Sequence, residues 1–164
     1  MEEKEILKEY IKEVKKSVDF FSGSKKKYRE KWVVKQFLNN LHIKFKETEI
    51  QISSEEPPDV IFRDARFEIK EVLDEDRKRH KEYREALEKA KNAKKFSDLF
   101  ERCSPQEATI QDIAELIEQK LSEYILDSEL YSKIDMLFYV NLEDLFFVKL
   151  ILPLEKAAKY LITY

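Results

Sequence analysis

Three charged residues stand on two short apolar segments near the middle of the chain. Asp59 is the second residue of the segment PDVIF at 58–62, and Glu68 and Lys70 alternate with apolar residues in FEIKE at 67–71. Carboxylates suit Mg²⁺, and an ammonium stabilises the charge that develops on a phosphate under attack. The pattern therefore indicates a metal-dependent phosphodiester hydrolase. Because 40% of the residues are charged, a merely solvated strand face is the competing explanation.

The spacing of these residues can be tested against strand geometry. Side chains alternate between the two faces of a strand, so Glu68 and Lys70 share a face and Glu71 points away from them. The segment RDAR at 63–66 has no apolar residue larger than alanine and predicts a turn between antiparallel strands. Such a hairpin sets Asp59 beside the later part of the second strand, where cross-strand neighbours lie about 5 Å apart. We therefore expect one shared cleft.

Size and composition limit the alternatives. A chain of 164 residues with 43% hydrophobic content predicts one folded domain over 1–164. It has no apolar run long enough to span a membrane, and its charged N-terminus lacks the apolar core of a signal peptide. The single cysteine excludes an internal disulfide and favours the reducing cytoplasm. The single glycine excludes Gly-rich phosphate loops.

Charge gives weaker guidance about partners. The net charge of −3 argues against a protein that coats nucleic acid. Basic residues nevertheless cluster at 25–31 and at 77–84, where they could contact phosphates. Acidic residues are interleaved with both clusters, so a salt-bridged surface explains much of the same pattern.

Apolar periodicity predicts helices separated by strands. The helix expected at 110–125 has an apolar side that includes Tyr124. A continuous apolar run at 136–140 predicts a central strand covered on both faces. The expected helices are about 3–20, 25–41, 75–94, 110–125 and 153–164; the expected strands are about 43–52, 58–62, 67–73, 136–140 and 145–152, with a cap-like turn at 104–107.

Two helices carry polar residues on apolar faces. Glu30 falls one turn before Val34 on the apolar stripe of the second helix, where a glutamate is costly to bury unless it is paired or binds a metal. A half-exposed glutamate stabilised by the helix dipole is the alternative. On the helix at 75–94, His80 and Tyr83 share a face near the strand that carries Glu68. That face either overlooks a cleft or is the edge of a core.

The predicted order, a helix, three strands, a helix and a strand, resembles the PD-(D/E)XK nuclease superfamily, whose core has the order αβββαβ. Pro58-Asp59 and Glu68-Ile69-Lys70 match its signature. More narrowly, the chain is similar to a small bacterial family of unknown function whose members are described as candidate endonucleases. The similarity extends over about 17–145, and the tail from about 146 departs from it. The matching segments are FFS at 20–22, REKWVV at 29–34, PDVIFRDARFEIKEV at 58–72, RHKEY at 79–83 and DMLFYVNL at 135–142.

The resemblance implies a restriction-endonuclease-like α/β fold with a mixed central sheet flanked by helices. It also implies that Asp59, Glu68 and the carbonyl of Ile69 hold Mg²⁺ or Mn²⁺, with Glu30 as an accessory ligand. Lys70 would then orient or activate water and stabilise the phosphate. The implied substrate is DNA, with RNA second, and a homodimer is one candidate assembly.

Arg77, His80 and Tyr83 are also expected to contact the substrate. This expectation rests on the face of the helix at 75–94 that we expect to overlook the cleft, and not on the signature. Two other classes of protein stay open. The fold could serve as an inactive module that binds nucleic acid or a protein partner, because the superfamily contains inactive members. Alternatively, the helices could carry the contacts of an interaction protein.

Overall fold

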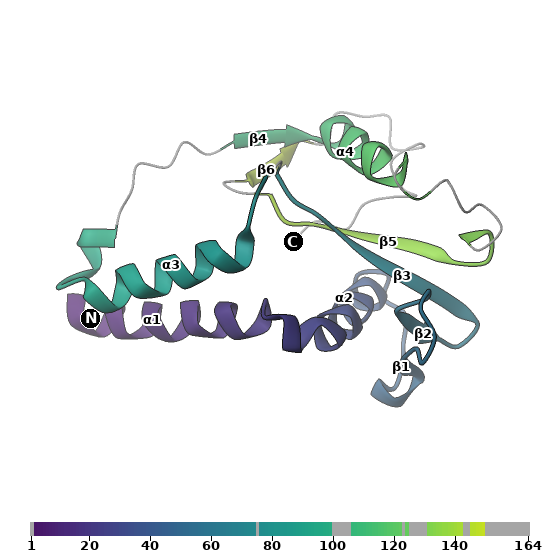
Figure 1. Ribbon diagram of the computed structural model, residues 1–164, viewed down its shortest axis with the longest axis horizontal. Coiled ribbons are helices and arrows are strands. Elements are labelled where there is room, and N and C mark those ends of the chain that lie inside the picture. Colours follow the sequence, from purple (N-terminus) through teal and green to yellow (C-terminus); the bar gives the residue numbers. More distant parts are fainter. Residues whose placement is uncertain are drawn as a thin grey trace. The chain divides into compact units, whose positions relative to one another are not determined.

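The computed structural model describes residues 2–74, 76–99, 106–122, 124, 131–142 and 145–149. These residues divide into two compact units. The first unit takes the described residues of Met1–Arg29 and Asp76–Cys103, and the second takes those of Glu30–Glu75 and Ser104–Tyr164. Figure 1 labels the elements of both units.

The first unit is a pair of antiparallel helices, α1 (Glu3–Phe20) and α3 (Arg79–Asn92). Phe21 follows α1 and stacks on Tyr83 near the start of α3, with ring centroids 5.1 Å apart and planes at 6°. At the opposite end, Tyr10 makes an edge contact with Phe96 in the short helix η3 (Phe96–Leu99). Aromatic contacts therefore join both ends of the pair.

The Arg29 side chain caps the C-terminus of α1. Its Nη1 donates hydrogen bonds to the carbonyls of Phe20 (2.7 Å) and Ser22 (2.8 Å), beside the short helix η1 (Gly23–Lys25). The last carbonyls of a helix have no partner within the helix, and a basic side chain satisfies them well. These two bonds link the first residue of the REKWVV segment to the backbone of the FFS segment.

The second unit is built around a mixed sheet of four strands in the order β1-β2-β3-β5. The bounds of the strands are Ile50–Ile52 for β1, Val60–Phe62 for β2, Ala65–Val72 for β3 and Asp135–Val140 for β5. Strands β1, β2 and β3 pair antiparallel, whereas β3 and β5 pair parallel. Two helices supply the buried residues that pack on the sheet: α4 (Ile110–Ser122) and α2 (Lys26–Asn40), which belongs to this unit from Glu30 onward.

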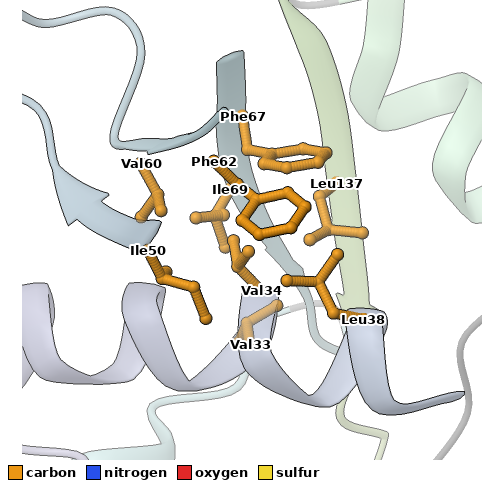
Figure 2. Close-up of a cluster of buried hydrophobic side chains, with 9 residues drawn as sticks. All are labelled: Val33, Val34, Leu38, Ile50, Val60, Phe62, Phe67, Ile69 and Leu137. Atoms are coloured by element: carbon orange, nitrogen blue, oxygen red, sulfur yellow. The ribbon is translucent and has the colours of Figure 1, made fainter. Parts of the chain in front are cut away.

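One face of the sheet packs against α2 in the cluster that Figure 2 shows. Val34 and Leu38 on α2 are at most 1% exposed and lie against Phe67 and Ile69 of β3. The cluster consists of Val33, Val34, Leu38, Ile50, Val60, Phe62, Phe67, Ile69 and Leu137.

The opposite face packs against α4, where Ile113 and Ile117 are buried with Val72, Phe138 and Val140. Successive side chains of β3 therefore enter two different cores. The charged residues at 68 and 70 share the face of Val72, which is the face that α4 covers. The predicted alternation along this strand is confirmed.

A second sheet contains β4 (Gln106–Thr109) and β6 (Leu145–Lys149), which pair parallel. The cap-like turn expected at 104–107 is wrong for 106 and 107, which belong to β4. The capping signal lies slightly later, because the Thr109 hydroxyl accepts from the Asp112 N–H (3.1 Å) and the Asp112 carboxylate accepts from the Thr109 N–H (2.7 Å). This reciprocal pair starts α4.

The predicted fold class is confirmed: the second unit contains a mixed four-stranded sheet between helices, in the order α2, β1, β2, β3, α4, β5. The strand expected at 43–52 is wrong in extent. Only Ile50–Ile52 is a strand, and Glu47–Glu49 forms a short 3-10 helix (η2) because the Glu49 carboxylate accepts the Lys46 N–H at 2.6 Å.

Two helices differ in length from the prediction. The helix expected from 75 starts at Arg79, because Asp76 has a φ of 59° that no right-handed helix contains. The helix expected to reach 125 ends at Ser122. The closing helix expected at 153–164 lies outside the described residues. Among the described residues, no helix combines the length and apolar character that a membrane crossing needs.

Leu38 on α2 and Leu41, which follows α2, test the position of the core between α2 and the sheet. Leu38 is 1% exposed and Leu41 is 54% exposed. Leu38→Ala should lower the free energy of unfolding by about 2–5 kcal/mol, because it leaves a cavity between α2 and the sheet. Leu41→Ala should change it by less than about 0.5 kcal/mol. Urea unfolding measures both, and equal effects would contradict the position of α2.

Candidate functional site

Asp59 lies at the open end of the β2–β3 hairpin. Its backbone N–H donates to the Phe67 carbonyl (2.9 Å), and its Oδ2 accepts the backbone N–H of Ile69 (2.9 Å). The residue is only 6% exposed. The predicted hairpin therefore brings Asp59 alongside the residues that flank Ile69, with a turn shortened to Arg63 and Asp64.

Glu68 and Lys70 form an ion pair on the face of β3 that α4 covers. The Lys70 Nζ lies 2.7 Å from Glu68 Oε1. The side chains are 20% exposed for the lysine and 10% exposed for the glutamate. The second carboxylate oxygen of Glu68, Oε2, is buried and accepts no hydrogen bond. A buried anionic oxygen without a partner is costly and marks a place where a cation would be stabilised.

The Lys70 ammonium lies within the influence of several groups. Burial is the largest influence and lowers the pKa of Lys70, but the hydrogen bond to Glu68 and the electrostatic interactions with Glu68, Tyr124 and Asp59 together raise it above its ordinary value. The Lys70 Nζ is also 4.4 Å from the centroid of the Tyr124 ring. Both carboxylates of the predicted site thus act on the same ammonium.

The donor set fits a magnesium ion. Continuing the register of Val60 with Phe67 sets Ile69 opposite Pro58, which has no N–H to offer a neighbouring carbonyl. The N–H and C=O of one residue point to the same edge of a strand. The Ile69 carbonyl therefore points to the edge of β3 where the Ile69 N–H donates to Asp59. Mg²⁺ commonly takes one or two carboxylates and keeps several waters, which suits this sparse set.

Glu30 is only 6% exposed, which excludes the half-exposed position that the sequence left open beside the buried one. Among the described residues, no three histidine, cysteine, aspartate or glutamate side chains gather closely enough to hold a metal ion. The assignment of Asp59, Glu68 and the Ile69 carbonyl as ligands of a metal ion stays a prediction. The role of Glu30 as an accessory ligand stays a prediction.

The three residues expected to contact substrate belong to the first unit. Arg77 precedes α3 and pairs with Glu82 (Nε to Oε2, 2.9 Å). Tyr83 stacks on Phe21, and the Nδ1 of His80 is buried without a hydrogen-bond partner. Their proposed contact with substrate stays a prediction.

Tyr124 of the second unit and Arg79 of the first are two residues that the sequence did not single out. Tyr124 lies on the apolar side expected for the helix at 110–125, and nothing in that pattern indicates that its ring lies beside Lys70, with 4.4 Å between Nζ and the ring centroid. Arg79 was counted in a basic cluster, but it is 7% exposed and its guanidinium lies 3.7 Å from the centroid of the Phe21 ring. No sequence signal separates such a buried arginine from its exposed neighbours.

Comparisons with known proteins agree with parts of this picture. The family that matches residues 2–161 is described as "Putative endonuclease, protein of unknown function (DUF1780)". A solved structure similar to this chain is a protein of unknown function from Pseudomonas aeruginosa strain PAO1, described as belonging to the monooxygenase superfamily. It is 23% identical, with a TM-score of 0.58, and the match covers 98% of this chain and 75% of that chain.

No curated protein matches the chain. A structural likeness at 23% identity shows the fold alone, and the PD-(D/E)XK superfamily is not confirmed by these comparisons.

The ion pair of Glu68 and Lys70 predicts a specific pattern of stabilities. Lys70→Ala should lower the free energy of unfolding by on the order of 3 kcal/mol, because it leaves a buried carboxylate unpaired. The double variant Glu68→Leu with Lys70→Met should recover most of that loss, because apolar residues of similar size need no partner. Urea unfolding measures both variants. A double variant no more stable than Lys70→Ala would contradict the pairing.

Proposed function

The chain belongs to the family that matches residues 2–161, and we propose that it is a metal-dependent endonuclease that hydrolyses phosphodiester bonds of DNA. The observation that carries the proposal is the ion pair of the Lys70 ammonium with the buried carboxylate of Glu68, whose Oε2 has no partner. The charge of the buried Asp59 acts on the same ammonium. The description of the family as an endonuclease supports the same chemistry. The match of these residues to the PD-(D/E)XK signature also supports it.

In this proposal Asp59, Glu68 and the Ile69 carbonyl hold Mg²⁺ or Mn²⁺. The bound ion would polarise the phosphate and lower the pKa of the attacking water. Asp59 is oriented for this task by the Ile69 N–H, which fixes one of its carboxylate oxygens. Glu68 is held by Lys70 through Oε1 and presents Oε2 to the ion.

Lys70 has a separate task. An ammonium has three N–H donors, and one of them binds Glu68. A second donor can bind a non-bridging phosphate oxygen or the attacking water, and its charge stabilises the negative charge that builds up in the transition state. Burial strengthens this effect, because charges interact more strongly away from water.

Phosphodiester cleavage tests the proposal directly. Purified protein should nick supercoiled plasmid DNA with Mn²⁺ or Mg²⁺ and stop on addition of EDTA. Asp59→Ala and Lys70→Ala should each lower the rate by about 10²–10³-fold, the usual effect of removing an electrostatic stabiliser. Glu71→Gln is the matched control, because Glu71 lies on the opposite face of β3 and binds Asn141. Cleavage that persists in Asp59→Ala would overturn the assignment.

Metal binding can be measured without catalysis. Mn²⁺ at about 100 times its Kd should raise the free energy of unfolding by about 2.7 kcal/mol, because the ion binds only the folded state. Glu68→Gln should remove this gain and Glu71→Gln should keep it. Urea unfolding with and without Mn²⁺ gives the comparison. DNA binding in a protein that neither binds Mn²⁺ nor cleaves would instead favour an inactive nucleic-acid-binding module.

A further inference from the structure

Lys70 needs a second contact to act on substrate reproducibly. A lysine side chain has four rotatable carbon–carbon bonds, and ordering it costs up to about 2 kcal/mol of conformational entropy. Its hydrogen bond to Glu68 orients it only partly, because Glu68 is also the carboxylate proposed to hold the metal ion. A contact that does not compete for the ammonium's N–H donors would be the most useful.

The Tyr124 ring offers such a contact. Its face lies 4.4 Å from the Lys70 Nζ, well inside the range of about 6 Å over which an aromatic ring attracts a cation. The attraction comes from the negative potential of the ring face, so no carboxylate or hydroxyl oxygen has to accept from the ammonium. Part of the ammonium is shielded from water, which makes the contact stronger than at a fully exposed site.

Neighbouring contacts hold the Tyr124 ring in place. The backbone N–H of Tyr124 donates to the Leu121 carbonyl in the last turn of α4 (2.9 Å). α4 is anchored on the sheet by Ile113 and Ile117, which are at most 1% exposed. Tyr131 also meets the Tyr124 ring edge-on at 6.2 Å. The helix that covers the face of Glu68 and Lys70 therefore also places the ring against the ammonium.

We propose that Tyr124 is a positioning residue, whose ring face holds the Lys70 ammonium beside Glu68 and directs its remaining N–H donors toward the phosphate. The inference rests on the proposed function and assigns it a residue outside the strand signature. The ring and not the hydroxyl carries the role, so phenylalanine should replace tyrosine at this position whereas an aliphatic residue should not.

Kinetics separate this role from a structural one. Tyr124→Leu should lower kcat for plasmid cleavage on the order of tenfold with little change in KM, because DNA binding does not depend on the ring. Tyr124→Phe should keep kcat within about twofold of the wild-type value. Tyr28→Leu, at a tyrosine that is 59% exposed, is the matched control and should keep the wild-type rate.

A spectroscopic readout tests the contact without catalysis. In protein labelled with ¹³C at the lysine ε carbon, the Lys70 signal, assigned by its loss in Lys70→Arg, should lie upfield because of the ring current of Tyr124. The shift should persist in Tyr124→Phe and vanish in Tyr124→Leu. An unchanged signal in Tyr124→Leu overturns the contact, whatever the activity of the protein.

The possible failures are distinguishable. An active wild-type protein with an unchanged kcat in Tyr124→Leu, or with equal losses in the Leu and Phe variants, overturns the role of Tyr124 alone. A wild-type protein that cleaves no DNA with Mn²⁺ overturns the proposed function and this role together.

Discussion

The hydrogen bond from the Ile69 N–H to the Asp59 carboxylate is the interaction on which the candidate site depends. Strand β2 begins at Val60, which pairs with Phe67, so the part of β3 beyond Phe67 has no β2 residue opposite it. Pro58 cannot extend the ladder with an N–H, and the Asp59 side chain takes the place of the missing strand. The bond fixes the Asp59 carboxylate beside Ile69, the residue between Glu68 and Lys70, and the charge of Asp59 acts on the Lys70 ammonium.

The Glu68–Lys70 pair gives the site its electrostatic character. A buried ion pair contributes little net stability, because the loss of hydration offsets most of the attraction. Apolar residues at both positions would serve the fold as well or better, and Glu68 Oε2 adds the cost of an unsatisfied oxygen. A cost of this kind is typical of functional sites, where charged groups are held ready for a ligand. A divalent cation would satisfy that oxygen and leave Lys70 its charge.

The sequence predicted the parts of this arrangement that depend on local spacing. The alternation of residues along β3 correctly placed Glu68 and Phe67 on opposite faces of the strand. The short polar turn predicted the hairpin that brings Asp59 to Ile69. The contact of Lys70 with Tyr124 could not be predicted, because it depends on the parallel pairing of β3 with β5 and on the packing of α4, both distant in sequence. The prediction of a strand from 43 was wrong for 47–49, because the Glu49 carboxylate accepts the backbone N–H of Lys46 and a short 3-10 helix forms there.

Anomalous diffraction from crystals soaked in Mn²⁺ tests the central claim most directly. We predict one strong peak about 2.0–2.3 Å from oxygens of Asp59, Glu68 and the Ile69 carbonyl, with waters completing an octahedron. Crystals of Glu68→Gln should lose this peak. The account is contradicted if saturating Mn²⁺ gives no peak beside these residues, or if the ion binds only elsewhere on the protein.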